Sequence, residues 1–189
     1  MGLLTIIKKS KIKDREIRIL ILGLDGSGKT TFVKRLKNED TSTISPTVGF
    51  NVDTIAINTF NVSLWDIGGQ KSIREFWRNY FEKTDALIWV VDSAAPQRFA
   101  DCKAELDKVL MTERLEGASV CIACNKQDIS GAVQSDEIAT NLGLKDLRNR
   151  PYKVFDVSAV SGHNVSEVIE WTVSDIERRL FMYETVTSE

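Results

Sequence analysis

The sequence lacks any long apolar segment. None of its apolar runs approaches the roughly 20 residues needed to span a bilayer, and the N-terminus lacks the apolar core and small-residue cleavage site of a secretory signal. An excess of one charge is also missing, with 25 Lys and Arg residues against 27 Asp and Glu. Nucleic-acid binding through phosphates needs a basic surface. We therefore expect a cytosolic protein with no nucleic-acid partner and at most a local, peripheral contact with a membrane.

Cysteine and histidine are scarce as well. Three cysteines in 189 residues are too few for a disulfide framework. Cys121 and Cys124 have CxxC spacing, but they lie in an apolar run, and on a strand their side chains would point to opposite faces of the sheet. They therefore cannot readily share a metal or a disulfide. The single histidine, His163, has no partner with catalytic or metal-binding spacing, so we expect no catalytic role for it.

Apolar runs rich in β-branched residues alternate with amphipathic segments along the chain. The runs predict strands at Ile17–Leu22, Ala86–Val91, Val120–Ala123 and Val154–Val157. Asn58 and Thr59 separate Phe50–Ile57 from Phe60–Trp65, which predicts an antiparallel hairpin. Helical spacing predicts helices at Gly28–Leu36, Phe99–Leu115, Ser135–Leu142 and Asn164–Leu180. We therefore expect one α/β domain, with a mostly parallel sheet that has one antiparallel edge and is covered by helices.

Two segments fall outside this alternation. Residues 1–14 place Leu3, Leu4, Ile6 and Ile7 ahead of four lysines, so a helix there would be amphipathic and basic. A helix packed in a groove of the domain, a membrane-surface anchor and a partner-binding arm all fit this pattern. Residues 38–47 are polar and have no clear period, which predicts a mobile loop.

The segment Gly23–Thr30, with the sequence GLDGSGKT, matches the phosphate-loop pattern in full and lies between a predicted strand and a predicted helix. Its glycines let backbone N–H groups curl around a β-phosphate at the positive end of the helix dipole. The Lys29 ammonium would bridge the β- and γ-phosphates, and the Thr30 hydroxyl would bind magnesium. The predicted phosphate-binding residues are Gly23, Asp25, Gly26, Ser27, Gly28, Lys29, Thr30, Thr31, Thr47 and Gly69.

A phosphate loop alone also fits ATPases and nucleotide kinases, so base recognition must decide. The segment Asn125–Asp128 follows a buried strand, and the Asp128 carboxylate can accept hydrogens from N1 and the N2 amino group of guanine. Adenine would leave this carboxylate without a partner, at a cost of roughly 1–3 kcal/mol, so we predict GTP specificity. The predicted guanine-binding residues are Asn125, Lys126, Asp128, Ser158, Ala159 and Val160, with the Ala159 backbone reaching O6.

Four residues are placed to act on magnesium and the γ-phosphate. Asp66, at the end of the hairpin, can hold magnesium through a water, and Thr47 in the polar loop can add a second hydroxyl. The Gly69 N–H can meet the γ-phosphate. Gln70 is the predicted catalytic residue, because it can orient the attacking water. Both loops would then be ordered by the γ-phosphate and released when it leaves.

Taken together, these motifs resemble the small GTPases of the Arf family. The segments that carry the resemblance are Gly23–Thr30, Pro46–Phe50, Trp65–Gln70 and Asn125–Asp128, with Met1–Ile6, Arg78–Glu82 and Leu87–Ser93 most similar to Arf-like members of the family. The resemblance covers nearly the whole chain. It implies a Ras-like P-loop GTPase domain at residues 15–182, whose sheet is six-stranded, with an amphipathic helix at 1–14 and a tail at 183–189.

The resemblance also implies partners and moving parts. The N-terminal helix would leave the domain on GTP binding while the hairpin shifts register, and effectors would contact Phe50, Trp65 and Tyr80. Core packing is the alternative role for these aromatic residues. The implied partners are an exchange factor, a GTPase-activating protein, carriers of lipidated cargo and a tubulin-folding cofactor.

The chain departs from the family pattern at two places. Gly26 and Ser27 replace the usual Asn-Ala pair, which puts the rate of nucleotide exchange in doubt. Ile6 stands where N-myristoylation of Gly2 requires Ser or Thr, so we expect no acylation.

Slow GTP hydrolysis is expected from two local features. Residues 38–50 contain no Arg or Lys that could act as an arginine finger, and Asp25 would bring a carboxylate near the γ-phosphate. An activating protein would then supply the missing charge. Two alternatives stay open at this point, namely a membrane-recruiting switch of the Arf type and a metabolic P-loop kinase.

Overall fold

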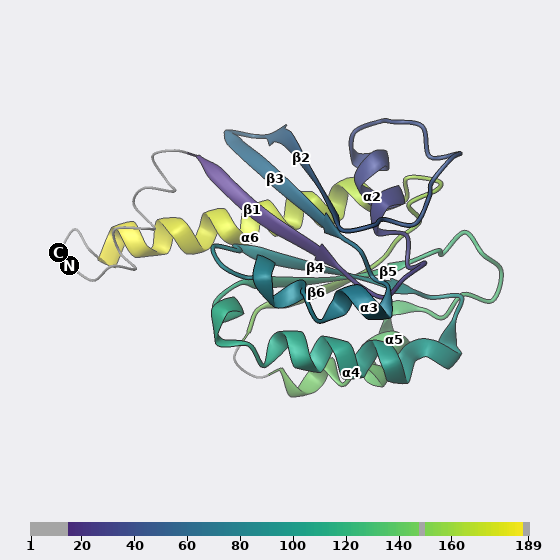
Figure 1. Cartoon of the computed structure of the whole chain (residues 1–189). Coiled ribbons are helices and arrows are strands. Elements are labelled where there is room, and N and C mark those ends of the chain that lie inside the picture. The colour runs from purple at the N-terminus through teal and green to yellow at the C-terminus, as the bar shows by residue number, and fades with distance from the viewer. Residues whose placement is uncertain (1–14, 148–149, 187–189) are drawn as a thin grey trace.

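The structure is a computed structural model and describes residues 15–147 and 150–186. Six strands form one sheet in the order β2-β3-β1-β4-β5-β6 (Figure 1). β2 runs antiparallel to β3, whereas the other neighbouring strands are parallel, which confirms the predicted mixed sheet. The strands are β1 (Glu16–Leu22), β2 (Phe50–Ile57), β3 (Phe60–Ile67), β4 (Ala86–Asp92), β5 (Ser119–Asn125) and β6 (Tyr152–Asp156).

Helices connect the strands. The α-helices of the described residues are α2 (Lys29–Leu36), α3 (Lys71–Arg74), α4 (Phe99–Leu110), α5 (Ser135–Asn141) and α6 (Val165–Val186). The short 3-10 helices are η1 (Trp77–Tyr80), η2 (Pro96–Arg98), η3 (Glu113–Leu115) and η4 (Leu144–Asp146). The helix predicted at 1–14 lies outside the described residues. No helix in the described part of the chain is long and apolar enough to cross a bilayer.

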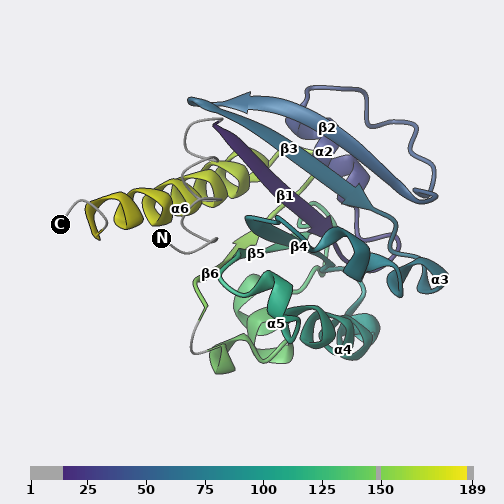
Figure 2. The same cartoon turned by 60° about the vertical axis from the view of Figure 1, so that its left-hand side comes forward.

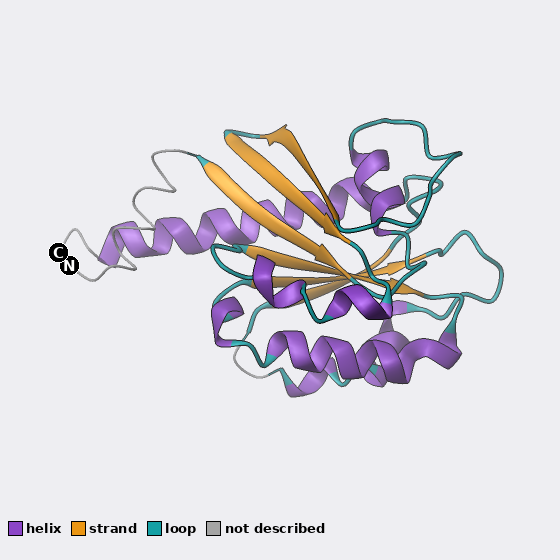
Figure 3. Cartoon of the chain, viewed as in Figure 1, coloured by secondary structure: helices purple, strands orange, loops and turns teal. Residues whose placement is uncertain are grey.

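Helices cover both faces of the sheet, as Figures 2 and 3 show, and a hydrophobic core lies on each face. α2 and α6 cover one face, where Phe32 and Val168 are fully buried. α4 and α5 cover the other face, around Leu106 and Ile138. The central strands β4 and β5 are buried on both sides, which explains why their sequences are continuous apolar runs.

The three cysteines are buried and free. Cys121 belongs to the core beneath α2 and α6, and Cys124 to the opposite core, as the strand spacing predicts. Burial raises the pKa of the Cys102 thiol to about 11, which keeps this cysteine protonated at neutral pH. All three cysteines therefore behave as small apolar side chains.

Some predicted boundaries differ from the observed ones. The helix predicted to reach Leu115 ends at Leu110, because Thr112 has extended backbone angles, and Leu115 reaches the core from η3 instead. α6 continues to Val186, past the end predicted for the helix and across the predicted start of the tail at residue 183. α3 and η1 are absent from the sequence-based prediction, since segments of four residues carry too little periodicity to be recognised.

Candidate functional site

The polar motifs meet at one edge of the sheet. The loops after β1, β3, β5 and β6 all leave the carboxyl ends of parallel strands, where open α/β sheets bind their ligands. Figure 1 shows these loops gathered at the end of the sheet where α2 begins. The structure therefore brings the predicted phosphate, magnesium and base residues to one place.

The phosphate loop, Gly23–Thr30, is held closely against its neighbours. Gly28 has a φ of +93°, and a Cβ on it would lie 2.2 Å from Asn125 Nδ2, so both conformation and space require glycine. Gly26, with a φ of +72°, faces open space. The side chain of Ser27 is buried, and its hydroxyl has no hydrogen-bond partner. The loop thus combines a fixed backbone with one unpaired buried hydroxyl.

The Lys29 ammonium lies inside this loop. Its Nζ donates to the carbonyl oxygens of Gly23 and Leu24, both at 2.9 Å. Burial lowers the pKa of Lys29 to about 8, although the charges of Asp66 and Asp25 act in the opposite direction. An anionic phosphate at the loop would favour the charged form and raise this pKa again.

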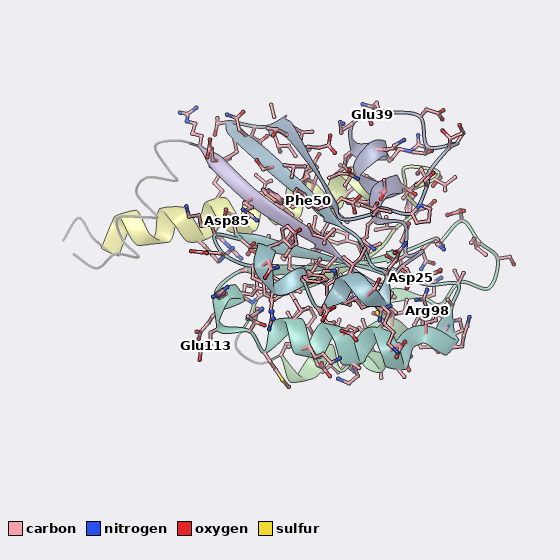
Figure 4. The ribbon with its side chains drawn as sticks, viewed as in Figure 1. Asp25, Glu39, Phe50, Asp85, Arg98 and Glu113 are labelled. Atoms are coloured by element: carbon pink, nitrogen blue, oxygen red, sulfur yellow. The ribbon has the colours of Figure 1, made fainter. Side chains whose placement is uncertain are left out.

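The Asp25 carboxylate is paired with two arginines, and Figure 4 shows Asp25 and Arg98 side by side. Its Oδ1 accepts hydrogen bonds from Arg98 Nη2 at 2.7 Å and from Arg74 Nη2 at 3.0 Å. Burial acts to raise the pKa of Asp25, but the hydrogen bonds and charge of Arg98, with Arg74, lower it below its ordinary value. The carboxylate is ionised, but two cations compensate its charge. Asp25 therefore presents no free negative charge that would slow hydrolysis, contrary to the expectation from the sequence.

Thr30, Thr47 and Asp66 converge from α2, the polar loop and β3. The two threonine hydroxyl oxygens are 2.7 Å apart, and Thr30 Oγ1 donates to Asp66 Oδ2 at 2.7 Å. Burial raises the pKa of Asp66, whereas the hydrogen bond from Thr30 acts to lower it. The other oxygen of this carboxylate, Oδ1, is buried and has no hydrogen-bond partner among the described residues. Thr31 is half-buried in the first turn of α2. The oxygen set Thr30, Thr47 and Asp66 fits a magnesium ion, which usually binds one or two carboxylates together with phosphates and water.

The loop after β3 presses against the phosphate loop. The Gly69 carbonyl accepts the Asp25 N–H at 3.1 Å. A Cβ on Gly69 would lie 2.5 Å from Asp25 N, so only glycine allows this approach. Gln70 follows as the half-buried N-cap residue of α3. Gly69 therefore lies against the phosphate loop, where a γ-phosphate would have to be contacted, and Gln70 is the next residue along the chain.

Asn125 joins the phosphate loop to the loop after β6. Its side chain is buried, with Nδ2 donating to the Ser27 carbonyl at 2.8 Å and Oδ1 accepting the Ala159 N–H at 2.9 Å. The Ala159 N–H is thus already hydrogen-bonded, and the predicted contact with guanine O6 requires this bond to be shared or moved. Asn125 therefore holds the phosphate loop and the loop after β6 together, a role that the motif alone does not indicate.

The remaining base residues form an open edge. Asp128 is exposed, and its Oδ1 accepts a hydrogen bond from Ser158 Oγ at 2.6 Å. Lys126 Nζ pairs with Asp92 Oδ2 at 2.6 Å. Val160, the residue after Ala159, is 59% exposed. This edge offers a carboxylate, a lysine stem and an apolar side chain to a flat base.

The three predicted effector residues form one aromatic cluster on β2, β3 and η1. The rings of Phe50 and Trp65 are stacked, with centroids 5.6 Å apart, and Tyr80 lies 5.3 Å from Phe50 and 6.1 Å from Trp65. Phe50 is 46% exposed, whereas the other two are half-buried. The guanidinium of Arg18 lies 3.8 Å from the Trp65 ring centroid and supports the cluster from β1. The cluster is therefore partly core and partly surface.

Sequence reasoning missed the charged residues that orient the motifs. Besides the two arginines on Asp25, Arg35 Nε donates to the Ala159 carbonyl at 3.0 Å, and Asp92 pairs with Lys126. These partners are 34 to 124 residues apart in the sequence. No local spacing connects them, so a single sequence contains no signal for these contacts.

Comparison with known proteins decides the family. The chain matches the model of the ADP-ribosylation factor (Arf) family over residues 3–176. This chain belongs to the Arf family. ADP-ribosylation factor-like protein 2 of Arabidopsis thaliana is 52% identical over 183 residues, which cover 96% of this chain and 99% of the relative. The protein of the same name from Drosophila melanogaster is 50% identical over 181 residues, covering 96% and 98%. The predicted similarity to Arf-like members of the family is thus confirmed, and these relatives are named Arf-like protein 2.

A solved structure supports the same assignment. The Arl6 BBS3 small GTPase from Trypanosoma brucei, with the bound nucleotide analogue GppNp, has a TM-score of 0.79 and 30% identity, covering 86% of this chain and 98% of its own. As an Arf-family GTPase, the protein binds GTP or GDP with Mg²⁺, hydrolyses GTP and acts as a switch with regulators and effectors. Neither the metabolic kinase nor the membrane-recruiting alternative is favoured.

Proposed function

We propose that the nucleotide lies along the edge of the sheet with its phosphates in Gly23–Thr30 and its guanine on Asn125–Asp128. Thr30, Thr47 and, through a water, Asp66 hold magnesium, while Gln70 orients the attacking water. The observation that carries this proposal is the convergence of four loops from distant parts of the sequence on one site. The Asn125 side chain links the phosphate loop to the loop after β6, through hydrogen bonds of 2.8 and 2.9 Å.

Exchanging Asp128 for Asn tests the base contact. The amide can donate to the O2 of xanthine but cannot accept both guanine hydrogens, so Asp128→Asn should weaken GDP binding at least tenfold and favour xanthosine diphosphate. Affinities are measured by fluorescence titration, and Asp136→Asn, an exposed carboxylate on α5, is the matched control. If Asp128→Asn bound GDP as the unmodified protein does, Asp128 would not read the base.

We infer that residues 15–182 form the GTPase domain, with an arm at 1–14 and a tail at 183–189. β1 begins at Glu16, and Ile176 is the last core residue in the part of the chain whose side chains the structure describes, so the described core falls within these limits.

Hydrolysis is proposed to be slow without an activating protein. Residues 38–50 supply no Arg or Lys, and Arg74 and Arg98 are both paired with Asp25. An arginine supplied by an activator is worth roughly 10³–10⁵ in rate. Single-turnover hydrolysis by the purified protein should therefore be slow, and a rate in the range of about 5–20 s⁻¹ without any activator would contradict the proposal.

The GTP form is proposed to bind carriers of lipidated cargo and a tubulin-folding cofactor in the cytosol. The support is the resemblance to Arf-like protein 2, together with an aromatic cluster of which Phe50 is 46% exposed. Exposed aromatic side chains are enriched among the residues that dominate protein–protein binding energy.

A further inference from the structure

Three segments of the chain meet on the Asp25 carboxylate. Arg98, at the end of η2, contacts both the carboxylate and the backbone of Asp25, with Nη2–Oδ1 and Nη1–O distances of 2.7 Å. Arg74, from α3, donates to the carboxylate through Nη2 at 3.0 Å and to the Gly69 carbonyl through Nε at 2.9 Å. We call Asp25, Arg74 and Arg98 the Asp25 cluster. It joins the phosphate loop to the loop after β3 and to the start of α4.

The two arginines belong to helices of different length. Arg98 precedes Phe99, which is buried at the start of the 12-residue helix α4. Arg74 ends α3, a helix of four residues, and its side chain is 8% exposed. A force that displaces α3 would therefore remove Arg74 from Asp25 while Arg98 stays in place.

The charge of Asp25 matters because of where it lies. Asp25 is four residues before Lys29, and the charges of Asp25, Arg74 and Arg98 all influence the Lys29 ammonium. A carboxylate without its arginines would repel the phosphates bound in the same loop. With both arginines present, the charge of Asp25 is neutralised, and Glu105 Oε1, 3.9 Å from Arg74 Nη1, balances the remaining positive charge.

We propose that Arg74 and Arg98 are positioning residues that neutralise Asp25, and that displacement of α3 exposes the Asp25 charge and speeds release of the nucleotide. The inference rests on the proposed binding of nucleotide phosphates in Gly23–Thr30. It adds a route by which an exchange factor can act, because a factor that displaces the four-residue helix α3 also removes Arg74 from Asp25. The Asp25 cluster then transmits this movement to the phosphate loop.

Release of a fluorescent GDP from the full-length protein, chased with excess GDP, tests the proposal. Arg74→Gln and Arg98→Gln should each raise the release rate roughly three- to tenfold. Adding Asp25→Asn to either variant should bring the rate to within about twofold of Asp25→Asn alone, because no charge is then left to neutralise. Lys71→Gln, which removes one exposed positive charge from the same helix, should change the rate less than twofold.

Two controls keep the outcome specific. Arg98→Lys retains the charge and should release GDP more slowly than Arg98→Gln, whereas a purely steric role would make the two alike. Melting curves of each GDP-bound variant identify any that do not fold. Acceleration that persists unchanged in the Asp25→Asn background, or no acceleration in Arg74→Gln and Arg98→Gln, would overturn the inference and leave the proposed function intact. An unmodified protein that retains no GDP would overturn both.

Discussion

At the scale of single residues, the site depends on side chains whose charge is controlled by burial. Lys29 is 6% exposed, and within the described residues its ammonium donates to two carbonyl oxygens, which do not neutralise its charge. Burial therefore lowers its pKa to about 8. Asp66 shows the complementary effect, since burial raises its pKa. Both groups gain a charged partner when a nucleotide and a magnesium ion bind.

The pKa of Lys29 predicts a pH-dependent affinity for GDP. Bound phosphate raises this pKa, so binding above about pH 8 must add a proton to Lys29, whereas below pH 8 the ammonium is already charged. The dissociation constant should be flat from pH 6.5 to about 7.5 and rise above pH 8, by at most tenfold per pH unit. Fluorescence titration at fixed ionic strength measures it. A constant that stays flat to pH 9 would show that Lys29 keeps its proton in the free protein.

At the scale of elements, the sequence predicts well what depends on local pattern. The six strands, the hairpin turn at Asn58 and Thr59, and the starts of α2, α4 and α5 follow from hydrophobic period and motif position. The break in the helix after Leu110 could not be predicted, because Leu115 keeps the helical spacing although it packs from η3. The short helix α3 has too few residues for any period.

The residues of the site fall into the same two groups, those that a local pattern reveals and those that depend on the tertiary fold. The glycines, Lys29 and the Asn125–Asp128 segment are recognised from fixed local spacings. The contacts of Arg74 and Arg98 with Asp25 span 49 and 73 residues and depend on the tertiary fold. Sequence reasoning therefore finds the residues assigned to the nucleotide, and misses those that position them.

The aromatic cluster of β2, β3 and η1 is predicted to be an effector contact. Phe50→Ala should reduce binding of a purified carrier of lipidated cargo to the GTP-analogue form at least tenfold, because truncating a large aromatic anchor removes its buried contact area. GDP affinity should not change. Thr59→Ala, at the exposed hairpin turn, is the control. Equal carrier binding by both variants in a calorimetric titration would assign Phe50 to packing alone.

At the scale of the whole molecule, the segments that form the hydrophobic cores differ from those that would respond to the nucleotide state. The cores around β4 and β5 hold the phosphate loop and the base residues on a rigid frame. The segments that would respond to the γ-phosphate, the polar loop with Thr47 and the loop with Gly69 and Gln70, flank the antiparallel hairpin at the edge of the sheet. We propose that a change at the phosphates reaches the aromatic cluster through these two segments.

The most direct test of this account is titration of the nucleotide-free protein with fluorescent GDP, GTP and ATP, with and without magnesium. The account predicts tight binding of both guanine nucleotides that weakens when magnesium is removed, and ATP binding weaker by at least about a hundredfold. Equal affinity for ATP, or no binding of any nucleotide, would contradict it.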